Sequence, residues 1–375
     1  VEEDLIVYVG PKKNFPASVT TRTLAGTTLM PGMIEGHSHI LLHPYNETGW
    51  TEQVLNESHA ERTARAVNHL KANLMAGFTT LRDLGSEGAG YTDVGLRTAI
   101  EKGVIPGPRL LVAGPAIVVT GSYGPKGFHE GVHVPLGAEE ADGHDDLIKT
   151  VRRQIGHGVD YIKVYADYRW GPDNSAMPTF SLEELLLIVQ TAEASGRVVV
   201  AHAATAEGMR RAALAGVSTI EHGDGGNSLV FSLMKSKGVA LCPTIAAGEA
   251  IERYRGWNKN DSKNTPARIT NKRQSVSLAL QAGVDIVAGG DVGVFPHGEN
   301  AVELELMEEY GFSRDFILKS VTSGNARLLN LAQLGELKSG YLADIIAVEG
   351  DPLQDLSSLK KVVFVMKDGV VYKTN

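Results

Sequence analysis

The chain has 375 residues, of which 43% are hydrophobic, 6% aromatic and 21% charged, the composition of an ordinary globular protein. Its formal net charge of -8 gives no reason to expect a nucleic-acid partner, and no apolar run reaches 18 residues, which excludes a membrane-spanning helix. No signal peptide is recognisable. We therefore expect a soluble protein. Because the sequence begins at Val1 without an initiator Met, the expected location is either the cytoplasm or outside it after removal of a leader.

The pattern of apolar residues changes twice along the chain. Residues 1–30 predict short strands at 5–9, 20–24 and 27–30, separated by Gly and Pro. After an opening strand that ends near residue 39, apolar runs alternate with amphipathic segments. The further expected strands are 79–84, 109–113, 161–166, 198–202, 218–222, 239–243 and 285–291. The expected helices are 59–76, 92–102, 144–157, 181–195, 205–215, 228–237, 267–282, 300–310 and 313–331. A polar insertion is expected at 244–266.

Eight strands with intervening helices predict a parallel sheet covered by helices. This number favours a (β/α)8 TIM barrel over an open doubly wound sheet, and no GxGxxG motif indicates a dinucleotide site. Strands return at 344–348, 362–367 and 370–372, with Asp368-Gly369 as a hairpin turn. We therefore expect a barrel domain at 31–335 and a small β-sandwich domain built from 1–30 plus 336–375.

Histidines and one aspartate occupy the ends of the predicted barrel strands, where TIM-barrel active sites lie. His37 and His39 would point to one side of the first strand, because side chains alternate along a strand. Taken alone, this pair fits a polar strand end as well as a metal site. The other strand-end candidates are Lys163, His202, His222 and Asp291. Such a set is hard to explain by packing, and it predicts a metal centre.

These motifs resemble the metal-dependent amidohydrolase superfamily, in its imidazolonepropionase-like and prolidase-like (Xaa-Pro dipeptidase-related) subgroup. The resemblance runs from Pro31-Gly32-Met33-Ile34-Glu35-Gly36-His37-Ser38-His39 through Lys163, Glu221-His222-Gly223 and Asp291 to Leu337–Asp344. It implies two divalent metal ions, usually zinc. His37, His39 and Asp291 would hold the more buried ion and His202 and His222 the more exposed one. Lys163, as a carbamate, would bridge both.

The resemblance also implies a mechanism. A cationic lysine cannot ligate a metal, whereas its carbamate is an anionic bridge with two oxygens; the alternative is a lysine that extends to solvent at the barrel rim. Two metals would produce hydroxide from water near neutral pH. Asp291 would take its proton and pass it to the leaving nitrogen.

The substrate contacts are less firmly indicated. Tyr123 stands where relatives of this subgroup carry a carbonyl-binding His, with His129 as the fallback. Ala204 replaces the Tyr that usually binds a substrate carboxylate, so Tyr165, Tyr168 or Arg169 would take that role. His297 either reaches the site mouth or stabilises its own loop. Two other features are expected to be structural: Glu35 replaces the more usual Asp behind the ligands, and Arg82-Asp83 forms a pair near the barrel end.

The predicted activity is hydrolysis of a C–N amide bond in a small molecule. The expected substrate is an N-acyl or N-aroyl amino acid or a dipeptide, as for a carboxypeptidase or dipeptidase. The alternatives are a lactonase or phosphotriesterase on the same metals, a cyclic-amide hydrolase, and a non-catalytic scaffold. Deaminases of the superfamily lack the strand-4 lysine, so Lys163 argues against them. A small-molecule substrate is the expected partner, with no nucleic acid and no membrane, and we expect a homo-oligomer.

Overall fold

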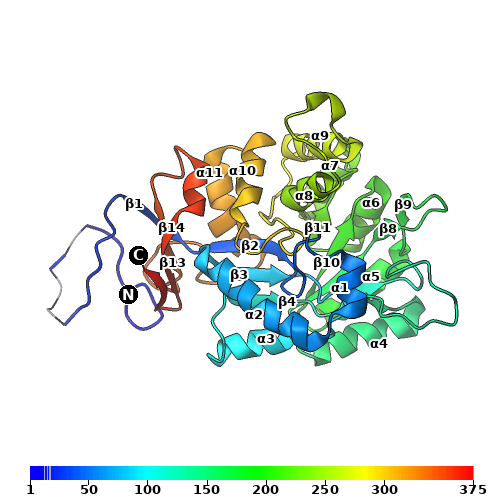
Figure 1. The fold of residues 1–375 in the computed structure, drawn as a ribbon, viewed down its shortest axis with the longest axis horizontal. Helices are drawn as coiled ribbons and strands as arrows, with labels where there is room; N and C mark the ends of the chain where they lie inside the picture. The colour runs from blue at the N-terminus through cyan, green and yellow to red at the C-terminus, as the bar shows by residue number, and fades with distance from the viewer. Residues whose placement is uncertain (12, 15, 17, 375) are drawn as a thin grey trace.

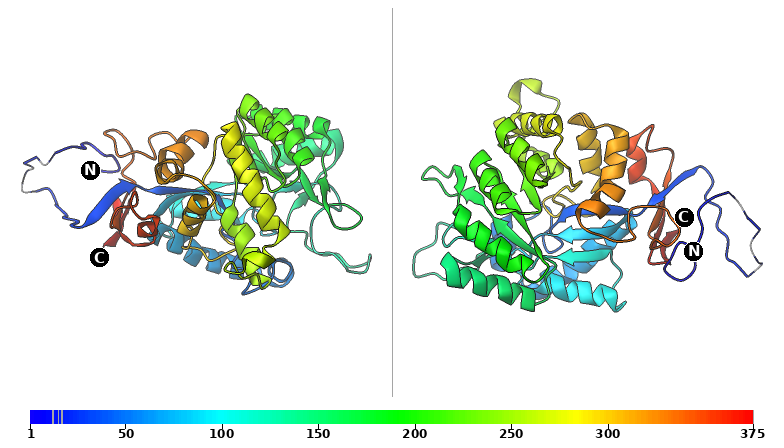
Figure 2. Two further views of the ribbon diagram at one scale, coloured as in Figure 1. Left: turned by 90° about the horizontal axis from the view of Figure 1, so that it is seen from above. Right: turned by 180° about the vertical axis from the view of Figure 1, so that it is seen from behind.

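The computed structural model describes every residue except 12, 15, 17 and 375. Parallel strands and the helices around them form the larger part of the molecule, and an antiparallel sheet lies at one end (Figure 1). The N- and C-termini both lie at the end that carries this sheet, as the two further views also show (Figure 2). The architecture is therefore mixed α/β, with the termini remote from helices α4, α5 and α6.

The parallel strands form two sheets. The first has the order β2-β3-β4, and the second has the order β12-β11-β10-β7-β5-β6. The bounds are β2 Met33–Ser38, β3 Phe78–Asp83, β4 Arg109–Val112, β5 Ile117–Val118, β6 Glu139–Glu140, β7 Tyr161–Tyr165, β10 Val198–Ala203, β11 Thr219–His222 and β12 Ala240–Cys242. Six of the predicted strands are thus present within one or two residues at either end.

Residues 285–292 connect the free edges of the two sheets. Leu241 of β12 forms a parallel bridge with Ile286, and Ser38 of β2 forms another with Val292. The expected strand 285–291 is wrong as a regular strand, because only these isolated bridges form. The backbones approach too closely for side chains here: a Cβ on Gly289 would lie 2.6 Å from the His37 nitrogen.

Helices cover the parallel strands, and all except α1 and α8 lie, to within one residue, in segments predicted to be helical. Their bounds are α1 Trp50–Asn56, α2 His59–Met75, α3 Thr92–Glu101, α4 Gly143–Gly156, α5 Leu182–Glu193, α6 Ala206–Ala215, α7 Ser228–Lys237, α8 Ile245–Tyr254, α9 Ala267–Ala282, α10 Ala301–Glu309, α11 Arg314–Lys319 and α12 Asn325–Leu328, with short 3-10 turns η1 Ser262–Asn264 and η3 Leu356–Lys360. A capping box begins α5, because Ser181 and Glu184 each bond the other's backbone nitrogen. Buried apolar residues of helices and strands form one large core.

The antiparallel sheet joins both ends of the described chain in the order β1-β13-β14-β15. Its strands are β1 Thr27–Pro31, β13 Ile345–Glu349, β14 Val362–Lys367 and β15 Val370–Thr374. The predicted turn is confirmed, since Asp368 and Gly369 both have left-handed backbone angles (φ 49° and 74°). The expected strands at 5–9 and 20–24 are wrong: apart from isolated bridges of Leu5 to Glu2 and to Leu342, the described residues there join no sheet. The second layer of a sandwich stays a prediction.

Three further segments differ from expectation. The insertion at 244–266 contains the helix α8, whose buried alanines an average over the polar segment conceals. The expected helix 313–331 is interrupted by a π-helical segment, η2 Ser320–Gly324. A hairpin of β8 Asp167–Arg169 and β9 Ala176–Pro178 follows β7. No helix in the described part of the chain is long and apolar enough to cross a membrane.

Asn325 provides a test of how the two parallel sheets are held together. Its amide donates to the carbonyls of Ile34 and Ala288, both at 2.8 Å, and accepts from the Ala288 nitrogen at 2.9 Å. We expect Asn325→Ala to leave these buried groups unsatisfied and to lower the free energy of unfolding by about 3 kcal/mol. Urea unfolding measures this. The control Asn68→Ala, on the exposed face of α2, should change it by less than about 0.5 kcal/mol, and equal effects would contradict the assignment.

Candidate metal centre

His37, His39 and Asp291 converge at the junction of β2 with segment 285–292. The Nε2 atoms of His37 and His39 lie 3.3 Å apart. Asp291 Oδ1 lies 3.7 Å from His37 Nε2 and 3.5 Å from His39 Nε2. One ligand atom from each residue falls within 4.8 Å of the others. This spacing suits three ligands of a single divalent ion.

The outer ring nitrogen of three histidines is occupied by a fixed partner. His37 Nδ1 lies 2.7 Å from Glu221 Oε2, His39 Nδ1 lies 2.9 Å from the Gly85 carbonyl, and His222 Nδ1 lies 2.8 Å from Thr244 Oγ1. Partners of this kind fix the orientation of metal-binding imidazoles and set which nitrogen carries the proton. They leave Nε2 of each ring free for a ligand.

Lys163, His202 and His222 lie on neighbouring strands beside these residues. Lys163 of β7 is opposite Val200 of β10, and His202 of β10 is opposite Glu221, which precedes His222 on β11. The His222 ring centroid lies 5.3 Å from that of His37 and 4.5 Å from that of His202. The structure thus brings the strand-end histidines that the sequence predicted into one cluster, with Lys163 buried beneath them at 1% exposure.

Burial and mutual repulsion disfavour the charged forms of these side chains. Burial, followed by the positive charge of Lys163, lowers the pKa of His202 to about 3 and holds the pKa of His37 well below its ordinary value. Burial and the neighbouring His202 lower the pKa of His222. Burial also lowers the pKa of Lys163. Neutral imidazoles are the form that binds metal, and a lysine with a lowered pKa loses its proton more easily.

Asp291 Oδ1 provides a direct test of whether a metal fits here. This oxygen is buried and has no hydrogen-bond donor, although buried carboxylate oxygens are normally paired. It faces the free Nε2 atoms of His37 and His39. Imidazole nitrogens combined with a carboxylate form a donor set that suits zinc and similar ions. A divalent cation at this point would satisfy the unpaired oxygen, so the residues fit such an ion.

A buried ion pair supports His37 from behind. Arg82 Nη2 lies 3.0 Å from Glu221 Oε1, and both side chains are fully buried. The expected Arg82-Asp83 pair is therefore wrong, since alternation along β3 turns the two residues to opposite faces. Asp83 instead accepts the Ile40 nitrogen at 2.7 Å. Glu221 bonds both His37 and Arg82, so its carboxylate fixes the orientation of the His37 ring.

Glu35 has the supporting role expected from the sequence. Its carboxylate accepts from the backbone nitrogens of His37 at 3.1 Å and Gly290 at 2.8 Å, and from the Asn300 amide at 2.9 Å. Burial raises its pKa to about 7. Glu35 therefore joins the two backbone segments that carry His37 and Asp291.

The predicted substrate-contact residues fall into two groups. Tyr165 stacks on His202 with ring centroids 4.6 Å apart, and Tyr123 lies against Tyr165 at 4.8 Å, so both adjoin the cluster. The Tyr123 hydroxyl donates to Glu87 Oε2 at 2.8 Å; its role as a donor to a substrate carbonyl stays a prediction. Arg169 is exposed, 5.8 Å from the Tyr168 ring.

The two other candidates, His129 and His297, are not drawn into this cluster. The His129 side chain is 74% exposed and bonds the Gly131 nitrogen in its own loop. His297 uses both ring nitrogens, at 3.0 Å from the Leu42 carbonyl and 3.0 Å from the Asn73 amide. These contacts favour the loop-stabilising role of His297.

The sequence reasoning missed several residues around the cluster. Glu87 and Trp50 fall outside the predicted strands and helices, and only the contact between them shows that they lie near the cluster. Lys272 of α9 was read as part of an ordinary helix, yet it is buried and donates to the carbonyls of His222 and Pro243, both at 2.6 Å. Thr244, which fixes His222, falls in the misread insertion. The sequence offers one signal for Glu87: it is a carboxylate that closely follows the predicted barrel strand 79–84.

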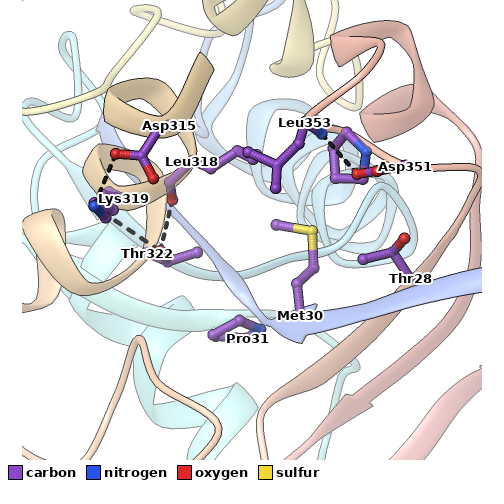
Figure 3. Close-up of a pocket in the computed structure, with 10 residues that line it drawn as sticks. Thr28, Met30, Pro31, Asp315, Leu318, Lys319, Thr322, Asp351 and Leu353 are labelled. Atoms are coloured by element: carbon purple, nitrogen blue, oxygen red, sulfur yellow. Dashed lines mark hydrogen bonds and ion pairs between the residues drawn. The ribbon is translucent and has the colours of Figure 1, made fainter. Parts of the chain in front are cut away.

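Two other features, a buried thiol and a surface pocket, are less suited to metal binding or catalysis. The thiol of Cys242 is buried near His37 and Glu221, and burial raises its pKa, so it is a poor ligand. A surface pocket lies between β1, α11 and the loop at 351–353 (Figure 3). Its lining includes Met30, Leu318 and Leu353, and none of the predicted site residues.

Glu221 allows the metal centre to be tested through its support. We expect Glu221→Gln to weaken metal affinity about 10- to 100-fold, because the amide cannot hold the His37 proton as a carboxylate does. Competition with a chelator measures the affinity, and thermal unfolding monitors the loss of the buried ion pair. Glu207→Gln, in an exposed pair with Arg210 on α6, is the control. Unchanged affinity in Glu221→Gln would contradict a metal at His37.

Comparison with known proteins agrees with this geometry. Residues 28–374 match the model of the amidohydrolase family. Ochratoxinase from Aspergillus niger is 30% identical over an alignment that covers 100% of this chain and 82% of the relative. Among solved structures, an Xaa-Pro dipeptidase with bound methionine in its active site has a TM-score of 0.84 at 29% identity, covering 99% of this chain and 93% of that one. The A. niger ochratoxinase structure has a TM-score of 0.82 at 28% identity, covering 100% and 90%. These neighbours share a fold of TIM-barrel type. The chain belongs to the amidohydrolase family and is a hydrolase that acts on C–N bonds.

Proposed function

We propose that this protein is a binuclear metal-dependent hydrolase that cleaves the amide bond of an N-acyl amino acid or a dipeptide. One observation carries the proposal: the unpaired, buried Asp291 Oδ1 faces the free nitrogens of His37 and His39. The relatives support the reaction class, since the matched names include an ochratoxinase and an Xaa-Pro dipeptidase.

The chain offers ligands for two ions. His37, His39 and Asp291 would hold one ion, and His202 and His222 the other. Lys163, carbamylated by carbon dioxide, would contribute an anionic oxygen to each. When bound, zinc-like ions acidify water and polarise a carbonyl. The lowered pKa of Lys163, caused by burial, supports this modification, because only the neutral amine reacts with carbon dioxide.

Asp291 would move the proton in this reaction. Its Oδ1 accepts no hydrogen bond, while the neighbouring backbone is held through the Gly290–Glu35 bond. Asp291 would accept a proton from water and deliver it to the nitrogen of the departing amine. Burial raises the pKa of Asp291, which brings its basicity closer to that needed for this transfer.

The parallel strands would bring these residues together by closing into a barrel. We propose that β2, β3, β4, β7, β10, β11, β12 and segment 285–292 form a closed (β/α)8 barrel spanning residues 31–335. The hydrogen bond from the Asp160 nitrogen to the Val112 carbonyl, at 2.8 Å, supports closure on one side. The bridges to Ile286 and Val292 support it on the other. Residues 1–30 and 336–375 would form the second domain.

Lys163 is the residue whose loss should separate two ions from one. We expect Lys163→Ala to abolish hydrolysis and to lower bound metal from two equivalents toward one, because the bridging ligand disappears. Metal content after dialysis and steady-state rates measure both effects. Lys149→Ala, on the exposed face of α4, should match the wild type. Two retained ions together with full activity in Lys163→Ala would remove the carbamate from the proposal.

A substrate screen tests the reaction class itself. The zinc-loaded protein is assayed against N-acyl amino acids, N-aroyl amino acids, dipeptides, lactones and phosphotriesters. We expect the highest kcat/KM among the amides, since the relatives at 29–30% identity include an Xaa-Pro dipeptidase and an ochratoxinase. A lactone or phosphotriester preferred by tenfold or more would replace the proposed function.

A further inference from the structure

Glu87 is a buried carboxylate that the proposed mechanism does not use. It follows β3, is 3% exposed and has a left-handed backbone (φ 48°) that residues with side chains rarely adopt. Its carbonyl and that of Ser86 accept from Arg62 at 2.7 and 3.2 Å. The backbone is therefore fixed in a strained form that aims the side chain inward, a pattern associated with functional positions.

Only neutral groups donate to the Glu87 carboxylate. Trp50 Nε1 and the Tyr123 hydroxyl both donate to Oε2 at 2.8 Å, and the Tyr165 hydroxyl lies at 3.4 Å from Oε1. No lysine or arginine of the described chain forms an ion pair with it, and His39 Nδ1, at 3.9 Å, already bonds Gly85. Buried charges are normally paired or coordinate a metal ion. Oε1, with one long hydrogen bond, has acceptor capacity left.

Aromatic rings surround this carboxylate. The centroid of Tyr123 lies 5.2 Å from that of Trp50 and 4.8 Å from those of both Tyr165 and Tyr168. Trp50 and Tyr168 are only half-buried, whereas Tyr123 and Tyr165 are buried. Electron-rich rings grouped around a carboxylate are the usual composition of a site for an ammonium ion. We call Glu87, Trp50, Tyr123, Tyr165 and Tyr168 the Glu87 cage.

The Glu87 cage borders the metal cluster at two points. Glu87 Oε1 lies 3.9 Å from His39, and Tyr165 stacks on His202 at 4.6 Å. A small substrate whose carbonyl lies at the cluster would therefore extend one end into the cage. An acyl group without charge would contact the rings but would leave the carboxylate without a counter-ion.

We propose that the Glu87 cage binds the ammonium group of the substrate's amino-terminal residue. This inference rests on the proposed function and narrows it: the enzyme prefers dipeptides with a free amino group over N-acyl amino acids. Glu87 would be a specificity-determining residue: its carboxylate would pair with the ammonium group, and the tyrosine rings would contact the rest of that group.

Matched substrates test the proposal. Ala-Pro, Ala-Phe and Ala-Leu are compared with their N-acetyl derivatives on the zinc-loaded wild type and on Glu87→Gln, which keeps the size of the side chain. We expect the wild type to favour the free amines. Glu87→Gln should lower kcat/KM about 10- to 100-fold for the free amines and less than about threefold for the acetylated forms. Equal losses for both members of a pair would mean that Glu87 only positions the tyrosines, and would overturn the proposal.

A binding measurement separates this proposal from the reaction class. Ligand-observed NMR follows tetramethylammonium chloride on the metal-loaded protein, against sodium chloride at equal ionic strength. We expect saturable binding that weakens at least tenfold in Glu87→Gln. Glu249→Gln is the matched control, because Glu249 is also buried and also accepts from a tyrosine, Tyr310. If no amide is hydrolysed, the proposed function fails but this titration still decides the cage; absence of saturable binding in the wild type overturns it.

Discussion

The fully buried ion pair between Arg82 and Glu221 joins strands that are far apart in the sequence. Arg82 extends from β3 to Glu221 on β11 and also donates to the Gly36 carbonyl at 2.6 Å and to Thr219 Oγ1 at 3.0 Å. His37 bonds to the same carboxylate. Removing two charges from water costs free energy, so this ion pair adds little to the stability of the fold and instead fixes the positions of the side chains around it. The position of His37, and through it of the neighbouring ligands, depends on this pair.

The ligand side chains are held in place by the backbone itself. His222 and Asp291 have left-handed backbone angles (φ 73° and 64°), and so does Thr244 (φ 46°), which fixes His222. Such angles cost about 1–3 kcal/mol each and persist only where neighbouring contacts enforce them. Lys272 enforces them at the His222 carbonyl, and Glu35 does so beside Asp291. Contacts within the protein therefore account for the backbone conformation of both residues.

The sequence predicts residues whose spacing follows the regular period of a strand or helix. The strand-end histidines belong to this group, because alternation and the end of an apolar run are both visible in the chain. The partners of those histidines are not, since Glu221 meets Arg82, and Trp50 meets Glu87, only through tertiary contacts. Segment 285–291 shows the same limit. Its apolar pattern predicts a strand, whereas its glycines allow a backbone approach that breaks regular pairing.

The first strand of the terminal sheet continues almost directly into the strand that carries the first metal ligand. Only Gly32 separates β1 from β2, and its nitrogen donates to the Asp344 carbonyl at 2.9 Å. β1 pairs with β13, which begins at Ile345, more than 300 residues later in the chain. A ribosome adds ~5–20 residues per second, so His37 emerges long before the strand that anchors it. The start of β2 therefore lacks this anchor until β13 has been synthesised, so the final position of His37 is set late in folding.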